Sequence, residues 1–387
     1  MKKALKFIPA CALALFLLAS CVLAPAASAE TAETAELEIS VSKRDASGEY
    51  DAAAAVTLSP EDDLTITEAG VYILSGVYEN QMIVIEVGEE DKVQLVLAGA
   101  TLTNENGPAI YVRSADKVFL TAAEGTVNTI SDGADYTLTD GDTTLDAAVF
   151  SKEDLTINGA GTLTISGNCK HAVVSKDDLV VTAKDLIVNA AKVGLGGKDS
   201  VTLSEAAVVI TAGSDGVRSE IGSILVDGGA FTIRASSDGI VAAELVGISG
   251  GSFDITASEG IEATYILISG GEITISASDD GINAARKSES YTPTVEITGG
   301  TVSVTMGAGD TDGIDSNGNI IITGGTISVN GSSSFDYDGS ASFTGGTVYV
   351  NGQQVTTLPN QMMGGGMGGF VGQGGMGGFG GGPGSRH

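Results

Sequence analysis

The chain has 387 residues, of which 49 are Asp or Glu and only 19 are Lys or Arg, so its formal net charge at pH 7 is −30. A surface this acidic repels nucleic acid and anionic membranes, which excludes both as direct partners, and it attracts divalent cations. The chain has no Trp and only 5% aromatic residues, so we expect few stacking platforms for sugars or bases.

Residues 1–29 have the pattern of an export signal. A basic start is followed by an apolar run over 7–23 and then by the small residues Ala27-Ser28-Ala29. This order predicts a signal peptide, and the absence of a later apolar span predicts no transmembrane segment. The alternative is a bacterial lipoprotein, because Leu18-Ala19-Ser20-Cys21 resembles a lipobox in which Cys21 carries a lipid anchor. Both interpretations place the protein outside the bacterial cytoplasm, either secreted or at the cell surface.

The remaining chain divides into three segments. Residues 30–57 are predicted to form an acidic linker and an N-terminal strand, and residues 58–355 form the folded body. Within the body, short apolar or alternating runs are separated by Gly and Asn-Gly, which is typical of strands without helices. Residues 356–387 are rich in Gly and Met, and Gly contributes no side chain to a core, so this tail is predicted to be disordered.

Two markers repeat along the body with nearly the same period. Acid-Gly pairs begin at Asp215, Asp238, Glu259, Asp280, Asp312 and Asp338. Gly-Gly pairs begin at Gly228, Gly250, Gly270, Gly299, Gly324 and Gly345. Agreement between independent markers indicates a structural repeat. The longest acid-Gly step, 32 residues, contains an insertion between Ala285 and Val295, which is expected to form a loop over the acidic corner.

Each repeat holds three short strands that are too hydrophobic to remain in water alone. Stacked copies pair every strand with its equivalent in the next coil, in parallel and about 4.8 Å away. In this arrangement Ile240, Ile248 and Ile255 point inward and stack on the equivalent isoleucines of the next copy, which are Ile261, Ile268 and Ile275. We therefore predict an all-β, monomeric protein with a right-handed parallel β-helix fold, a three-sided solenoid with about 21–25 residues per coil. A β-propeller needs roughly 40–50 residues per blade and does not fit this period.

Stacking also places the acid-Gly pairs above one another. Like charges in register repel, at about 1 kcal/mol per pair in water and several in a protein environment, so a cation should neutralise the column. Calcium binds carboxylate oxygens at about 2.3–2.6 Å, and twice this distance is close to the coil spacing. The candidate metal ligands are Asp215, Asp238, Glu259, Asp279, Asp280, Asp310, Asp312 and Asp315. The candidate ligand-binding residues beside them are Asn283, Arg286, Tyr291 and Asn317.

A simpler explanation of each acid-Gly pair is turn chemistry. Asp can hydrogen-bond its own backbone, and Gly tolerates a positive φ. This explains one pair better than it explains a column, because Asn or Ser would form the same turn without repulsion.

Catalytic motifs are scarce. The sequence contains no H-E-x-x-H, no G-x-S-x-G and no P-loop. One coherent catalytic alternative is a calcium-dependent polysaccharide lyase that uses Lys or Arg as the base. The candidates for that base are Arg218, Arg234, Arg286 and Lys287.

Several stretches of the body resemble a known family. These are SPEDDLTITEAGVYILSG from Ser59, DKVQLVLAGATLTNENGPAIYV from Asp91, FSKEDLTINGAGTLTI from Phe150 and TDGIDSNGNIIITGGTISVNG from Thr311. They resemble a bacterial family of exported carbohydrate-binding domain proteins, which has a calcium-containing right-handed β-helix similar to pectate lyases. The resemblance covers about residues 58–355 and implies binding of plant cell-wall polysaccharide.

The resemblance also implies that Asp215, Asp238, Asp280 and Asp312 are metal corners. Glu259 departs from the usual Asp but keeps a carboxylate, and Val193-Gly194 departs from Asp-Gly, so that coil should lack an ion. The sequence therefore predicts an extracellular protein that binds cellulose or pectin through a calcium-bearing acidic face. The alternatives are a non-catalytic structural adhesin and the lyase.

Overall fold

The computed structural model describes residues 39–62, 64–137, 144–307 and 311–360. The chain divides into two units, Met1–Glu36 and Leu37–His387, and the described residues all belong to the second. The predicted signal peptide, Cys21, Asp310 and most of the Gly/Met-rich tail lie outside the described residues. Within the described ranges, no helix is long and apolar enough to cross a membrane.

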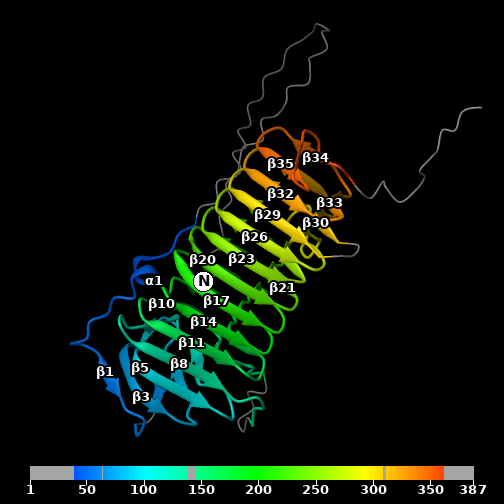
Figure 1. Ribbon diagram of the computed structural model, residues 1–387. Coiled ribbons are helices and arrows are strands. Elements are labelled where there is room, and N and C mark those ends of the chain that lie inside the picture. Colours follow the sequence, from blue (N-terminus) through cyan, green and yellow to red (C-terminus); the bar gives the residue numbers. More distant parts are fainter. Residues whose placement is uncertain (1–38, 63, 138–143, 308–310, 361–387) are drawn as a thin grey trace, which may run out of the picture. The chain divides into compact units, whose positions relative to one another are not determined.

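The described chain winds into stacked coils whose strands form three faces, and Figure 1 shows the strands of successive coils following one another as parallel arrows. The first face is a 12-stranded sheet. Its strands are β2 (Thr65–Ile66), β4 (Ile83–Glu86), β6 (Ile110–Ser114), β9 (Ala147–Ser151), β12 (His171–Ser175), β15 (Leu195–Gly197), β18 (Val217–Ser219), β21 (Asp238–Ala242), β24 (Glu259–Ala263), β27 (Ile282–Ala284), β30 (Asp312–Ser316) and β33 (Ser333–Tyr337).

The second and third faces share a 24-stranded sheet, because the long strands β3 (Gly70–Tyr78) and β5 (Lys92–Asn104) turn the corner and pair on both faces. The second face continues with β1 (Val56–Leu58), β7 (Lys117–Ala122), β10 (Asp154–Gly159), β13 (Asp178–Val181), β16 (Ser200–Leu203), β19 (Ser223–Val226), β22 (Leu245–Ile248), β25 (Tyr265–Ile268), β28 (Thr294–Ile297), β31 (Asn319–Ile322) and β34 (Ala341–Phe343). The third face continues with β8 (Val127–Asp132), β11 (Thr162–Gly167), β14 (Leu186–Ala190), β17 (Ala206–Ala212), β20 (Gly229–Ala235), β23 (Ser252–Ala257), β26 (Glu272–Ala277), β29 (Thr301–Met306), β32 (Thr326–Asn330), β35 (Thr347–Val350) and the antiparallel β36 (Gln353–Val355).

The core consists of apolar ladders inside the three faces. Ile240 pairs with Ile261 on the first face, Ile248 with Ile268 on the second and Ile255 with Ile275 on the third. All six side chains are completely buried. The predicted parallel β-helix and its inward-pointing isoleucines are therefore confirmed.

Coil length follows the sequence period. On the second face, one coil advances 24 residues from Leu155 to Leu179, another 20 from Val246 to Ile266, and another 25 from Val295 to Ile320. The coil with the insertion advances 29 residues, from Ile266 to Val295. Its extra residues leave the coil after β27, as the long step between the acid-Gly pairs predicts.

Each acid-Gly pair needs its glycine because a Cβ would not fit at that position, and not because the backbone is left-handed there. A Cβ on Gly239 would lie 2.4 Å from Cγ2 of Ile255 and 2.5 Å from the carbonyl oxygen of Gly260. The simpler explanation of the pair by turn chemistry, which allows a positive φ at this glycine, does not hold at Gly239, because the left-handed turn belongs to the other marker. The second glycine of the Gly-Gly pair, for example Gly300 with φ 81°, has the left-handed conformation.

One helix, α1 (Lys43–Ser47), lies within the segment for which only a linker and a strand were predicted. Ser42 and Asp45 form a capping box, and Gly48 ends the helix with φ 62°. The buried carboxylate of Asp45 accepts a hydrogen bond from Oγ1 of Thr156 at 2.6 Å and pairs with Nζ of Lys117 at 2.8 Å. These contacts hold α1 against the outer surface of the second face.

Candidate functional site

Two ladders of polar residues run across the first face from coil to coil. The first ladder lies where the strands begin and contains Val193, Asp215, Asp238, Glu259, Asp280, Asp312 and Ser333. Its register is visible in the backbone, where the amide of each following glycine donates to the acid of the next coil. Gly216 donates to the carbonyl of Asp238 at 2.8 Å, and Gly281 donates to that of Asp312 at 2.9 Å.

The predicted column is therefore correct from Asp215 to Asp312, and Val193 interrupts it upstream. It does not extend to Asp338, because Ser333 takes that position and donates a hydrogen bond to Asp312. Asp338 instead lies in the turn after β33, where its amide donates to the carbonyl of Ser316.

The second ladder lies three residues later in each coil and contains Arg218, Val241, Glu262, Asn283, Asp315 and Asp336. Sequence reasoning selected Asn283 and Asp315 but missed Glu262 and Asp336. A signal was present, since acid-Gly-Ile followed by another acid or Asn occurs at 259–262, 280–283 and 312–315. We call the members of both ladders from Asp238 to Asp336 the acidic edge.

The upstream part of the acidic edge is a group of three carboxylates, Asp238, Glu259 and Glu262. One oxygen from each lies within 4.8 Å of the others. Burial, followed by repulsion from Glu262, raises the pKa of Asp238 to about 6 and that of Glu259 to about 7. The group is partly compensated, because Nδ2 of Asn283 donates to Oε2 of Glu259 at 3.0 Å and Nζ of Lys287 lies 2.5 Å from Oε2 of Glu262.

The downstream part of the acidic edge contains Asp280, Asn283, Asp312, Asp315 and Asp336. Burial, together with repulsion from Asp280, Asp336 and Asp312, raises the pKa of Asp315 to about 7. Burial also raises the pKa of Asp280, and its Oδ1 accepts a hydrogen bond from the amide of Asp312 at 3.0 Å. Ionised carboxylates at these positions are therefore short of compensating charge.

Two buried oxygen atoms of the downstream part have no hydrogen-bond partner. They are Oδ1 of Asn283 and Oδ1 of Asp336, which lie on either side of Asp315 in the second ladder. A buried acceptor without a partner costs about 1–3 kcal/mol. An electropositive ligand between these coils would satisfy both atoms and the surrounding carboxylates.

Other predicted metal ligands do not join these groups. Asp215 is buried, but its carboxylate already accepts hydrogen bonds from Oγ of Ser214 at 2.9 Å and from Nη1 of Arg218 at 3.4 Å. Asp279 is exposed at the corner beside Asp280. Asp310 lies outside the described residues.

The predicted ligand-binding residues are also divided. Asn283 lies within the acidic edge. Arg286 pairs with Glu289 in the same exposed loop at 3.2 Å, and the ring of Tyr291 packs against Tyr265 with 5.4 Å between centroids. Asn317 is exposed in the turn after β30. The insertion thus reaches the acidic edge through Lys287 and not through Arg286 or Tyr291.

A pocket of about 360 Å³ adjoins the upstream carboxylates. It brings together two acids of the first ladder, Asp215 and Asp238, and two cations, Arg218 and Lys287. Of the four candidate bases for a lyase, these two lie beside the acids. Arg234 instead pairs with Asp254 on the third face at 2.7 Å.

A further carboxylate group, which sequence reasoning missed, lies at the start of the second face. Asp154, Asp177 and Asp178 each place an oxygen within 4.8 Å of the others. Burial, with repulsion from Asp178 and Asp177, raises the pKa of Asp154 to about 6, although Lys117 opposes the shift. Here Asp178 accepts a hydrogen bond from Oγ of Ser200 at 2.7 Å.

The donor atoms of the acidic edge are all oxygens. Such a set suits hard divalent cations, which take carboxylates, amide carbonyls and water, and it does not suit zinc in a Cys or His site. Asp280, Asp312, Asp315 and Asp336, with the amide oxygen of Asn283, could supply most of the six to eight oxygens that calcium prefers. The donor types therefore fit a calcium ion, and among the described residues of the edge it is the upstream group, Asp238, Glu259 and Glu262, that brings one oxygen from each of three acids within 4.8 Å of the others.

A family model and a relative with the same description both match this chain. A family model described as "Carbohydrate-binding domain-containing protein" matches residues 60–311 and 261–357. A relative from Acetivibrio thermocellus with the same description is 34% identical over 131 residues, which cover 34% of this chain and 46% of the relative, so the match spans about half of that protein. A solved structure described as a polysaccharide lyase-like protein from C. thermocellum, gadolinium derivative, is 26% identical, with 74% of this chain and 84% of that chain covered and a TM-score of 0.32.

Proposed function

The chain belongs to the family of carbohydrate-binding domain-containing proteins, and from this premise we propose that it is an extracellular protein that binds plant cell-wall-type polysaccharide, cellulose or pectin, through calcium held at the acidic edge. The observation that carries the proposal is the downstream part of that edge. There, stacked carboxylates with raised pKa values surround two buried oxygens that have no partner.

Asp280, Asp312, Asp315 and Asp336 would hold the ion between neighbouring coils, with Asn283 as a neutral ligand. When bound, calcium supplies a positive centre that can accept hydroxyl or uronate oxygens of a polymer. The chain's own contribution is rigidity. Backbone pairing of β27, β30 and β33 fixes the ladder positions, so the ligands need little reorganisation on binding.

Polymer recognition follows from the repetition of the ladders. Acids of the first ladder recur at about 4.8 Å on successive coils from Asp215 to Asp312, so an extended polysaccharide lying along the edge meets carboxylate oxygens from coil to coil. Many weak contacts of this kind together retain a polymer that the contacts of a single coil would not retain.

The cations beside Asp215 and Asp238 support binding over lyase chemistry. Lys287 pairs with Glu262, and Arg218 contacts Asp215, so carboxylates of the protein already engage both cations. Both cations are well placed to contact hydroxyl or carboxylate groups of a bound polymer.

Export is part of the same proposal. The basic start, apolar run and Ala27-Ser28-Ala29 support secretion, and Cys21 in its lipobox-like context supports attachment to the cell surface through a lipid. Either route delivers the acidic edge to the compartment where cell-wall polysaccharides occur. Calcium sites with millimolar dissociation constants can be occupied there.

The test is retention of the mature protein on insoluble cellulose and on calcium-pectate gel, with calcium or with excess chelator. We expect retention on one of these polymers that chelation abolishes and that the Asp280→Asn/Asp312→Asn/Asp315→Asn variant loses. Asp254→Asn is the control for loss of a carboxylate elsewhere, since it removes one exposed carboxylate from the third face, whereas the test variant removes three half-buried ones from the edge. No retention on any polymer would favour a structural adhesin, and release of unsaturated uronides from pectate would favour the lyase.

A further inference from the structure

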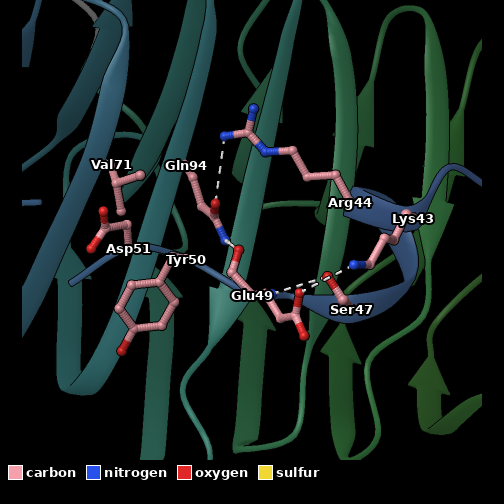
Figure 2. A pocket seen from close by; sticks show the side chains of 8 residues that line it. All are labelled: Lys43, Arg44, Ser47, Glu49, Tyr50, Asp51, Val71 and Gln94. Atoms are coloured by element: carbon pink, nitrogen blue, oxygen red, sulfur yellow. Dashed lines mark hydrogen bonds and ion pairs between the residues drawn. The ribbon is translucent and has the colours of Figure 1, made fainter. Parts of the chain in front are cut away.

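A pocket of about 370 Å³ lies at the N-terminal end of the described chain, between residues 43–51 and the outer surface of the second face. Figure 2 shows Gln94 at its centre, Tyr50, Asp51 and Val71 on one side, and Lys43 and Ser47 on the other. No residue of this pocket belongs to the acidic edge. Its volume falls within the roughly 300–1,000 Å³ typical of small-molecule sites.

The wall formed by α1 is held in place by an extensive network. Besides the contacts of its carboxylate, Asp45 accepts a hydrogen bond at its carbonyl from Oγ1 of Thr182 at 2.6 Å. Nδ2 of Asn158 donates to the carbonyl of Arg44 at 3.0 Å and to that of Asp45 at 3.1 Å. A five-residue helix with so many fixed backbone atoms forms a rigid wall, so the pocket exists before a ligand arrives.

The floor of the pocket carries a polar group with spare hydrogen-bonding capacity. Gln94 is only 1% exposed. Its Nε2 makes one good bond, to Oγ1 of Thr121 at 2.9 Å. The remaining bonds are long: Nη2 of Arg44 donates to Oε1 at 3.5 Å, and Nε2 donates to the carbonyl of Glu49 at 3.4 Å. A ligand hydroxyl beside Oε1 would complete the bonding of this buried amide.

The charges around the pocket cancel. Lys43 and Arg44 are balanced by Glu49 and Asp51, although the chain as a whole is strongly acidic. The guanidinium of Arg44 lies 4.3 Å from the centre of the Phe119 ring, which keeps the arm extended across the pocket. The lining thus offers donors, acceptors and the half-buried aromatic ring of Tyr50 without a net charge.

A neutral saccharide matches this lining. Sugar hydroxyls both donate and accept hydrogen bonds, so they can use cations and carboxylates side by side, and the apolar face of a sugar ring packs against an aromatic ring. A nucleotide or a uronate would gain from the cations but would meet Glu49 and Asp51. An apolar ligand would leave these charges without water or partners.

We propose that this pocket is a second saccharide site, which takes a neutral mono- or disaccharide unit and does not depend on calcium. The wall residues 43–51 precede the part of the chain that the family model matches, which begins at residue 60. The pocket's other wall, with Val71 and Gln94, lies within the matched part. The site stands independently of the acidic edge.

The test is calorimetric titration of the mature protein with cellotetraose, xylotetraose and tetragalacturonate in excess chelator. We expect one of the neutral tetrasaccharides to bind and the charged one to bind no better. Tyr50→Ala should lower that affinity about tenfold or more, as for an aromatic anchor. Asp51→Asn, a smaller change at an exposed residue, should weaken it without altering the melting temperature.

Two controls separate this site from the acidic edge. Tyr349→Ala removes a half-buried tyrosine on β35, far along the chain, and should leave tetrasaccharide affinity unchanged. The Asp315→Asn variant should also leave it unchanged even if that variant no longer binds polymer. Absence of binding by both neutral tetrasaccharides, full affinity in both Tyr50→Ala and Asp51→Asn, or binding that requires calcium would each overturn the proposal.

Discussion

Lys287 acts at the residue scale as a tethered counterion. Its ammonium lies 2.5 Å from the carboxylate of Glu262, and the amides of Lys287 and Ser288 both donate to Oγ1 of Thr264 at 2.9 Å. The insertion is therefore anchored so that one cation stands permanently beside the upstream carboxylates. The downstream carboxylates have no such lysine among the described contacts, which is why we assign calcium there.

Replacing Lys287 with Met should expose this difference. In chelator, the variant should lose about 1–3 kcal/mol of unfolding free energy, because Glu262 is left buried without its partner. Added calcium should then raise its melting temperature more than it raises that of the wild type, since the upstream group becomes available to the ion. Arg286→Met, from the same loop but at a residue that pairs with exposed Glu289, is the control and should behave like the wild type.

Asp315 makes the stability of the folded protein depend on pH, and the direction of this dependence follows from its pKa. Burial raises its pKa to about 7, whereas an unfolded Asp titrates near 3.9. The folded state therefore holds the proton more tightly, so this contribution to stability is fully present below about pH 4 and is lost as the pH rises through 7.

Asp315→Asn stays neutral and should escape this loss. In chelator, its unfolding free energy relative to the wild type should increase by roughly 1–2 kcal/mol between pH 4 and pH 8, after allowance for solvent screening. Denaturant melts at four pH values measure this directly. A difference that stays flat, or that changes in the opposite direction, would show that Asp315 is not perturbed in the folded protein.

At the scale of elements, repetition made the strands predictable. The acid-Gly and Gly-Gly markers predicted the register that pairs Ile240 with Ile261 and Asp238 with Glu259, because equivalent residues in a solenoid must stack. The same logic could have identified Glu262, had the position three residues after each acid been read as a second ladder. It could not have identified Asp336, because Ser333 stands where that coil would carry the acid.

Features outside the repeat were not predictable in this way. The helix α1 is only five residues long and has no sustained periodicity, and its position depends on Asp45 meeting Thr156, 111 residues later. The contact between Lys287 and Glu262 likewise depends on how an insertion folds back. Pairs of this kind arise from tertiary packing, which a local pattern does not encode.

Gly239 tests the packing of the acid-Gly corner. Gly239→Ala would place a methyl group 2.4 Å from Ile255 and 2.5 Å from the backbone of the next coil. We expect a loss of about 1–3 kcal/mol or more, as for overpacking of a core. Gly196→Ala, on the same face, is the control, because its nearest neighbour would be at an ordinary 3.4 Å. Equal melting temperatures of the two variants would contradict this account of the corner.

At the scale of the whole solenoid, stacking concentrates charge. Each coil from Asp215 to Asp336 adds one or two acids at nearly the same place, so a modest bias in the repeat produces an edge where the pKa values of three carboxyl groups rise to about 6 or 7. Strand pairing fixes these acids in register, and the free energy of the fold opposes their separation. In the proposal made above, calcium would relieve the repulsion at the coils where no lysine does, and the polysaccharide would bind where the ions are.

The most direct measurement of this claim is the melting temperature of the mature protein as calcium is added after chelation. An ion that binds only the folded state stabilises it by about 2.7 kcal/mol at one hundred times its dissociation constant. We predict a melting temperature that rises with calcium in the wild type and hardly changes in the Asp280→Asn/Asp312→Asn/Asp315→Asn variant. A wild-type melting temperature that does not respond to calcium, or an equal rise in the triple variant, would contradict the assignment of the acidic edge.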